Sequence, residues 1–177
     1  MKLCPPYLSF ILYNPIRKAL TDRGKVLAES GIHGSSVVLE VGAGNGFFTE
    51  ILARKAGKVY SIDVQEGMIR KLRERMKAFG GKVDIILGDI ATYSIGSEVA
   101  DVVLIYYSFH EVSNQAAAAA NIARTVKPGG TLSIYEPTVE VNKRQMQETI
   151  GMFESRGFVK EVKRDGLITR FARLRKQ

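Results

Sequence analysis

The chain has 177 residues, of which 45% are hydrophobic, as is typical of one globular domain large enough to bury a core. No apolar run approaches the length of a membrane-spanning helix, and a single cysteine, Cys4, excludes an intramolecular disulfide. The net charge of +8 permits contact with nucleic acid, but the basic residues are spread over several predicted elements, so a nucleic-acid partner is not favoured. The lone cysteine fits a reducing compartment, so we expect a cytoplasmic protein. We expect no signal peptide, because Pro5 and Pro6 interrupt the apolar start of the chain.

Residues 1–36 are expected to form a helical segment ahead of the sheet. Apolar Ile16, Leu20, Val26 and Leu27 alternate there with charged residues, as in amphipathic helices. Such a segment could be a lid over a site or an edge helix that only packs, and packing is the commoner role. Residues 37–177 are expected to form the core of the same single domain.

The most informative stretch predicts a strand, a tight glycine turn, a helix and a second strand. The run Val37–Val41 is mostly β-branched, as in a strand buried on both faces. Gly42, Gly44 and Gly46 follow at once, and apolar residues then recur at helical spacing before a strand that ends at Asp63. This order is that of a nucleotide-binding βαβ unit, so we expect a site where the glycine turn and Asp63 meet.

The rest of the chain alternates predicted strands with predicted helices. A run of five alanines favours helix strongly, and the pair Asp165-Gly166 predicts the turn of a closing hairpin. Without an internal repeat or linker, this alternation predicts an α/β fold with a single sheet. Further strands are expected at residues 83–87, 101–107, 131–135, 157–162 and 167–174, and helices at 65–79, 114–126 and 141–155.

The glycine turn and two carboxylates are the first candidates for a ligand site. A backbone without a Cβ allows a ligand to approach closely, and the following helix points its N–H groups at that ligand. The spacing is G-x-G-x-G, and Phe47 stands where the dinucleotide fingerprint needs a further glycine. Asp63 is placed to accept hydrogen bonds from ribose hydroxyls, the alternative being a helix N-cap. Asp89, after the third strand, has the same two interpretations, with the amino group of a base as its ligand.

Five segments carry a family resemblance: LEVGAGNGFFT, YSIDV, LGDI, DVVLIYYSFHEV and VKPGGTLSIYEP. In this order they resemble the glycine motif, the acidic second-strand motif, the adenine-contacting motif, the fourth-strand motif and the helix–turn–strand motif of class I S-adenosylmethionine-dependent methyltransferases. The small-molecule branch related to ubiquinone/menaquinone biosynthesis methyltransferases is the most similar. The resemblance covers residues 37–137, and the closing segments GFVKEV and LITRFARL are similar to the family's final strands.

The resemblance implies a Rossmann-like three-layer sandwich with helices on both faces of a seven-stranded, mostly parallel sheet. The implied strand order is 3-2-1-4-5-7-6, with strand seven antiparallel. It also implies S-adenosylmethionine as cofactor and S-adenosylhomocysteine as product. Asp63 would hold the ribose, and Asp89 the edge of the adenine. The implied cofactor-binding residues are Glu40, Gly42, Ala43, Gly44, Gly46, Asp63, Val64, Asp89, Ile90 and Tyr106. Candidates for lining the substrate path are Tyr107, Phe109 and Tyr13, although the aromatic residues could equally be core.

Methyl transfer requires few catalytic side chains, because a sulfonium methyl is already a strong electrophile. The protein contributes mainly by positioning the reactants and excluding water. A base helps where the acceptor is a hydroxyl or a carbon acid, and His110 and Glu111 are the nearest candidates after the fourth strand. His110 could instead only pack or cap, and Glu111 could be a first-turn residue favoured by the helix dipole. Glu136 is a weaker candidate. Two histidines and one cysteine predict no metal site.

The expected function is methyl transfer from S-adenosylmethionine to a small molecule, by a monomer or a homodimer. An RNA or protein methyltransferase is the alternative that the charge supports. The Asn/Asp-Pro-Pro-Tyr type of motif expected of amino-directed enzymes is replaced by Tyr106-Tyr107-Ser108-Phe109. A cofactor-binding module without catalysis, or a partner subunit, is the alternative from another class. A nicotinamide dehydrogenase is disfavoured by Phe47.

Overall fold

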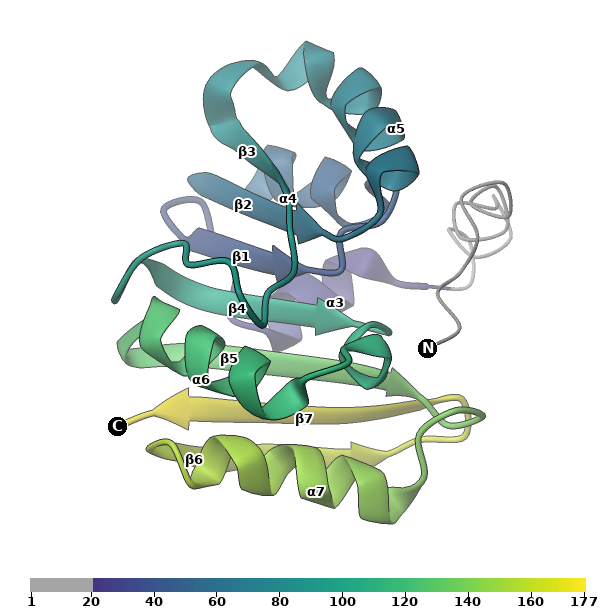
Figure 1. Ribbon diagram of the computed structural model, residues 1–177, viewed down its shortest axis with the longest axis vertical. Coiled ribbons are helices and arrows are strands. Elements are labelled where there is room, and N and C mark those ends of the chain that lie inside the picture. Colours follow the sequence, from purple (N-terminus) through teal and green to yellow (C-terminus); the bar gives the residue numbers. More distant parts are fainter. Residues whose placement is uncertain (1–20) are drawn as a thin grey trace.

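The computed structural model describes residues 21–177, which form a seven-stranded sheet flanked by helices (Figure 1). The strand order is β3-β2-β1-β4-β5-β7-β6, and β7 runs antiparallel to both of its neighbours. The fold that the resemblance implied is thereby confirmed. The strands are β1 (Val37–Val41), β2 (Lys58–Asp63), β3 (Val83–Leu87), β4 (Ala100–Tyr106), β5 (Val126–Pro137), β6 (Phe158–Asp165) and β7 (Thr169–Lys176). The helices are α3 (Arg23–Glu29), α4 (Thr49–Lys55), α5 (Glu66–Met76), α6 (Gln115–Thr125) and α7 (Lys143–Glu154), with short 3₁₀ turns η2 (Lys77–Lys82) and η3 (Phe109–Glu111).

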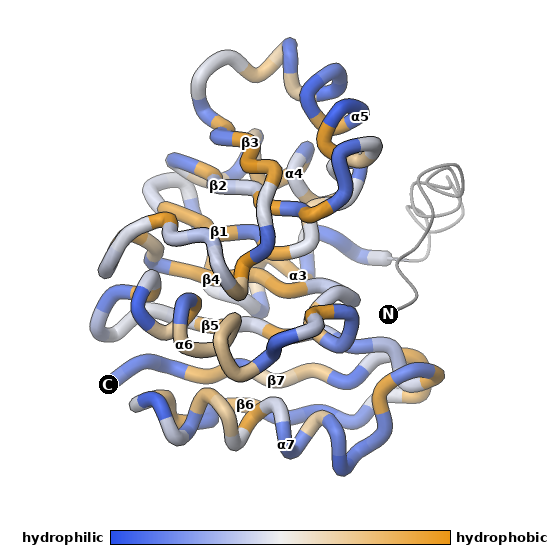
Figure 2. The backbone as a smooth tube through the Cα atoms, in the orientation of Figure 1, coloured by the Kyte–Doolittle hydropathy of each residue, from blue (hydrophilic) through white to orange (hydrophobic). Residues whose placement is uncertain are grey.

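The core lies on both faces of the sheet. In β1, Leu39 packs in the cluster that includes α6 and α7, and Val38 packs in the cluster that includes α3 and α4. A central parallel strand covered on both faces must be apolar along its whole length, which explains the unbroken runs in β1 and β4. Figure 2 shows hydrophobic stretches on the central strands, and hydrophilic residues interspersed with hydrophobic ones along α5 and α7.

Several element boundaries differ from the sequence expectation. The segment Lys127–Gly130 was expected to separate helix from strand, but β5 already begins at Val126. Pairing of β4 with β5 shifts register between Ala100 and Val102. An added Cβ on Gly130 would lie 3.0 Å from the Asp101 carbonyl oxygen, so glycine allows the backbones to approach closely. The helix expected at 65–79 ends at Met76 and continues as η2.

The described part of the expected N-terminal segment contains one helix, α3. Asp22 caps α3 by accepting a hydrogen bond from the Lys25 N–H at 2.8 Å, and Val26 and Leu27 are buried. Arg164 on β6 binds the Glu29 carboxylate through both guanidinium nitrogens, at 2.8 and 3.1 Å, which ties α3 to the closing hairpin. The expected lid lies mostly outside the described residues. Over residues 21–177, no helix is long and apolar enough to cross a membrane.

Candidate functional site

Two adjoining cavities lie at the carboxyl ends of the central strands. The larger has a volume of about 270 Å³, and the smaller about 60 Å³. Both are lined by Gly42, Asp63, Ser108 and Glu111, so they meet where the glycine turn approaches the end of β2. This is the edge at which open α/β sheets bind their ligands.

The three glycines of the turn have different roles. An added Cβ on Gly42 would overlap the Ser108 side chain, and one on Gly46 would lie 2.8 Å from Leu72 Cδ1 of α5. Gly44 also has a backbone conformation that favours glycine, with a φ of +56°. It differs from the other two because an added Cβ would meet no protein atom within 4 Å. Glycine at positions 42 and 46 therefore allows close packing of neighbouring side chains, whereas Gly44 leaves space beside the larger cavity. Gly46 lines neither cavity, and its expected contact with the cofactor stays a prediction.

The Asp63 carboxylate connects the glycine turn to the residue that precedes α5. Its Oδ2 accepts a hydrogen bond from the Gly44 N–H, and its Oδ1 accepts one from the Gln65 N–H, each at 2.8 Å. Asp63 is not the N-cap of α5, because Gln65 holds that position. Burial raises the pKa of the Asp63 carboxyl, and these two hydrogen bonds oppose the rise. The carboxylate fixes the glycine turn against the start of α5 at the junction of the cavities.

Glu40, a buried carboxylate two residues before the glycine turn, lines the larger cavity. The hydroxyls of Thr49 and Ser61 both donate to its Oε2, at 2.6 and 2.7 Å. Burial raises the pKa of Glu40 to about 7, against the effect of these hydrogen bonds. The carboxyl thus changes charge near neutral pH beside Gly42 and Asp63.

The smaller cavity contains all three residues expected at an adenine. Val64, Asp89 and Ile90 line it, and the Val64 side chain is unusually exposed for a valine, at 42%. Asp89 Oδ1 accepts a hydrogen bond from the Ala91 N–H at 2.8 Å, so Asp89 also stabilises its own turn. No helix begins after Asp89, because β3 is followed directly by β4, so the N-cap interpretation of Asp89 is wrong and its contact with the adenine stays a prediction.

Aromatic side chains form one wall of the larger cavity. Tyr106 and Tyr107 both line it and stack on each other, with ring centroids 4.3 Å apart. Tyr107 has a φ of +60°, a strained conformation for a bulky residue, and its hydroxyl contacts Thr169 of β7. Phe109 was expected beside them, but it is fully buried and packs on Phe153 of α7, so it belongs to the core. Tyr13 lies outside the described residues.

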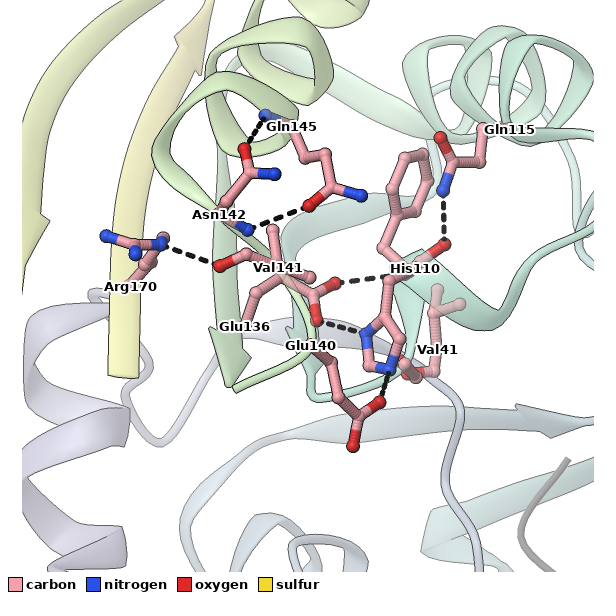
Figure 3. A network of polar contacts seen from close by, with 11 residues as sticks. Val41, His110, Gln115, Glu136, Glu140, Val141, Asn142, Gln145 and Arg170 are labelled. Atoms are coloured by element: carbon pink, nitrogen blue, oxygen red, sulfur yellow. Dashed lines mark hydrogen bonds and ion pairs between the residues drawn. The ribbon is translucent and has the colours of Figure 1, made fainter. Parts of the chain in front are cut away.

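His110 lines the larger cavity and is held between two carboxylates (Figure 3). Its Nδ1 lies 2.5 Å from Oε2 of Glu136, and its Nε2 lies 2.6 Å from Oε2 of Glu140. Oε1 of Glu136 also accepts a hydrogen bond from the His110 backbone N–H at 3.2 Å. Burial alone would lower the pKa of His110, but the hydrogen bonds and charges of Glu136 and Glu140 raise it to about 9.

Sequence reasoning underrated or missed three residues of this site. Glu136 is only 1% exposed and binds His110, although it was ranked below Glu111. Glu140 carries no motif, and only its place after a strand that ends at the site could have indicated it. Ser108 donates to the Val41 carbonyl at 2.8 Å and occupies the space that Gly42 leaves. Glu111 lines both cavities, and burial raises the pKa of its carboxyl.

Comparison with known proteins decides the family. The profile described as "Methyltransferase domain" matches residues 38–130, which is more than half of the chain. The chain belongs to this family. Its S-adenosylmethionine-dependent class is further supported by the crystal structure of a SAM dependent methyltransferase from Aquifex aeolicus. That structure is similar with a TM-score of 0.87 and 25% identity, over 99% of this chain and 100% of the other.

The chain spans only part of the length of the curated relatives that it matches. This methyltransferase domain is 33% identical, over 112 residues, to the ubiquinone/menaquinone biosynthesis C-methyltransferase of Hydrogenovibrio crunogenus. That match covers 60% of this chain and 44% of the relative. An uncharacterized methyltransferase of Geobacillus sp. strain WCH70 is 28% identical over 144 residues, which is 80% of this chain and 66% of the relative.

The residues present fit S-adenosylmethionine, the cofactor that this family implies. The open space beside Gly44 allows a ligand to approach the backbone closely, and the buried Asp63 carboxylate offers acceptor oxygens at the junction. The smaller cavity, with exposed Val64 and the neighbouring Asp89, suits a flat base. Over residues 21–177, no cluster of three or more metal-ligating side chains is found.

Proposed function

We propose that this chain transfers the methyl group of S-adenosylmethionine to a small-molecule acceptor. The observation that carries the proposal is the pair of adjoining cavities that meet at Asp63 and the glycine turn. We assign the smaller cavity to the adenine base of the cofactor. The larger is lined by Glu40, Tyr106, Tyr107 and His110, and we assign it to the methionine portion and the acceptor.

Each part of the cofactor has a proposed set of partners in this chain. Glu40 and the backbone from Gly42 to Gly44 would hold the methionine portion, and Asp63 would accept hydrogen bonds from the ribose. Val64, Asp89 and Ile90 would enclose the adenine. The bound cofactor supplies an electrophilic methyl group on a sulfonium. The stacked Tyr106 and Tyr107 would exclude water from the acceptor and orient it, which is the main contribution required of the protein.

A small molecule is favoured over nucleic acid as the acceptor. Neither of the two cavities is lined by lysine or arginine among the described residues, although the chain contains 26 of them. Several basic residues of the closing hairpin are engaged by carboxylates, as in the pairing of Arg173 with Glu161 at 2.9 Å. The similarity to a ubiquinone/menaquinone biosynthesis C-methyltransferase supports the same choice. A lone cysteine suits the cytoplasm, where we propose that a monomer or homodimer acts.

His110 and Glu111 remain the proposed groups for handling protons at the acceptor. With its pKa raised to about 9, His110 is an imidazolium at neutral pH and donates hydrogen bonds rather than accepting them. If it acts as a base, the rate of methyl transfer should rise with pH up to about 9.

The activity is tested by following a labelled methyl group. The full chain is incubated with methyl-labelled S-adenosylmethionine and, separately, with a panel of small phenols, enols, carboxylates and amines, with total RNA, and with denatured protein. The proposal predicts label in a small-molecule product and formation of S-adenosylhomocysteine, both abolished in Asp63→Ala. Label in the RNA or protein fraction alone would contradict it.

A further inference from the structure

The two carboxylates that bind His110 differ in how firmly they are fixed. Glu136 is 1% exposed and contacts His110 through both the imidazole and the backbone N–H. The Glu140 side chain is 57% exposed and meets only the outer nitrogen, Nε2, at 2.6 Å. Glu140 also lines the larger cavity, whereas Glu136 does not. One contact is therefore buried, and the other lies at the cavity surface.

The backbone beneath Glu140 is fastened independently of that contact. The Val141 carbonyl accepts a hydrogen bond from Arg170 Nε at 2.7 Å, and Asn142 and Gln145 form a reciprocal capping box at the start of α7 (Figure 3). The Thr138 N–H donates to the Ile168 carbonyl at 2.9 Å. The Glu140 side chain can therefore leave His110 by rotating, without any change in the turn between β5 and α7.

We propose that Glu140 is an exchangeable occupant of His110 Nε2, and that an anionic oxygen of the methyl acceptor takes its place. Glu136 is then a positioning residue, which fixes the imidazole so that Nε2 faces the cavity. This inference rests on the proposed function, because it assigns part of the same cavity to the acceptor. The recognised group is a carboxylate or an ionised hydroxyl.

The charges around His110 favour exchange over simple addition. The carboxylates that act on His110 are Glu136 of β5 and Glu140 of the turn that follows it. The neighbouring Glu111 of η3 interacts with His110 and with these two carboxylates, and also with Asp63 of β2. A further anion added to this group would be repelled. An anion that replaces the Glu140 carboxylate leaves the number of charges beside the imidazolium unchanged.

The exchange also offers a route for product release. Methylation of an ionised hydroxyl or carboxylate forms a bond from its oxygen to the methyl carbon, while the electron pair of the broken carbon–sulfur bond stays on the donor sulfur. The acceptor thereby loses its negative charge and becomes a poor partner for an imidazolium. The Glu140 carboxylate then regains Nε2, because a charge-assisted hydrogen bond is stronger than a neutral one.

The positioning role of Glu136 is tested by NMR of the imidazole protons. The chain has only two histidines, His33 and His110, so His110→Gln assigns both signals. Wild-type His110 should titrate near pH 9, and its midpoint should fall clearly in Glu136→Gln and less in Glu140→Ala. An unchanged midpoint in folded Glu136→Gln would overturn the positioning role.

The exchange is tested with coloured probes that differ in charge. The full chain is titrated with 4-nitrophenolate, 4-nitrobenzoate and neutral 4-nitroanisole, and binding is followed by absorbance. Glu140→Ala should bind at least one of the two anions about tenfold more tightly than wild type, because the internal competitor is gone, and His110→Gln should lose that binding. The phenolate and carboxylate arms decide which anionic oxygen is preferred. Glu154→Ala, which removes an exposed carboxylate at the far end of α7, is the matched control and should match wild type.

Two results would overturn the exchange. One is equal binding of 4-nitroanisole and of the anions, and the other is anion binding that is unchanged or weaker in Glu140→Ala. Glu140 is half exposed, so this variant does not depend on repacking the core. Calorimetry with S-adenosylhomocysteine on the same variants separates the two proposals. Cofactor binding without the exchange leaves the proposed function standing, whereas anion exchange without cofactor binding removes the proposed function and leaves only an anion site at His110 Nε2.

Discussion

The carboxylate of Glu136 accepts hydrogen bonds from two groups of His110, the backbone N–H at 3.2 Å and the imidazole Nδ1 at 2.5 Å. Because these residues belong to β5 and η3, the pair joins the ends of two elements that also frame the larger cavity. Protonation of His110 therefore contributes to the stability of the folded chain, and that contribution can be measured.

The first prediction concerns stability at alkaline pH. The pKa of His110 is raised to about 9 in the folded chain, above its ordinary value of 6.5, so its contribution is complete below about pH 6.5 and is lost as pH rises through about 9. Each pKa unit corresponds to about 1.4 kcal/mol, so the free energy of unfolding should fall by up to roughly 3 kcal/mol over this range. Urea denaturation at pH 6 and pH 10 measures the fall, and His110→Gln should remove most of it. An equal fall in wild type and variant would contradict the assignment.

The second prediction concerns Glu40. Its folded pKa is raised from 4.5 to about 7, so the stability it contributes is present below about pH 4.5 and is lost as pH rises through about 7. Glu40→Gln keeps an oxygen for the hydroxyls of Thr49 and Ser61 without the buried charge. The variant should be at least as stable as wild type at pH 8, as measured by urea denaturation. Its affinity for S-adenosylmethionine should nevertheless fall if the carboxylate holds the methionine amino group. A marked loss of stability of Glu40→Gln at pH 8 would show that the buried Glu40 carboxylate does not destabilise the folded chain.

The third prediction separates the roles of the glycines. Gly42→Ala should destabilise the fold by about 1–3 kcal/mol, because the new methyl group overlaps Ser108 in a packed region. Ser108→Gly should restore part of that loss in the double variant. Gly44→Ala has open space around the new methyl group, so its main effect should be weaker cofactor binding, with only about 1 kcal/mol of backbone strain. Thermal unfolding and calorimetry of the four variants test this division, and non-additivity of Gly42→Ala with Ser108→Gly is the decisive sign.

The fourth prediction follows from the burial of Phe109. Phe109→Ala should cost about 3–5 kcal/mol of stability, since it removes a fully buried ring that packs on Phe153. Tyr107→Phe is the informative comparison, because it removes only the hydroxyl that contacts Thr169 at the cavity wall. If Phe109 lined the substrate path instead, its loss would change the KM for the acceptor while leaving the melting temperature nearly unchanged.

Local patterns predicted much of the fold because each reports a physical requirement that is local in sequence. The β-branched run of β1, the glycine turn and the apolar stripe of α5 each specify one element, and all three appear where expected. The strand order came from the family resemblance, since pairing of β5 with β7 depends on contacts distant in sequence. The extra length of β5 at Val126 arises from tertiary pairing with β4, which no local pattern records.

The site was predictable where a motif marks a backbone conformation, and less so where side chains meet from different elements. Gly44, Asp63 and Asp89, which motifs mark, line the two cavities, and their contacts with the cofactor stay predictions. The meeting of His110 with Glu136 and Glu140 was not predictable, because 26 and 30 residues separate the partners and only the sheet brings them together. Phe109 was misplaced for a related reason, since sequence alone does not say which side of the η3 turn faces the core.

The central claim is that Asp63 and the glycine turn form the binding site for the cofactor, and calorimetric titration with S-adenosylhomocysteine tests it most directly. Wild type should bind, and Asp63→Ala should bind about 10- to 100-fold more weakly, because a hydrogen bond to a charged group contributes about 1.5–3 kcal/mol. Asp84→Ala is the control, since Asp84 pairs with Lys58 at 2.7 Å and lines neither cavity. Equal affinity of wild type and folded Asp63→Ala, or no binding by wild type, would contradict the account.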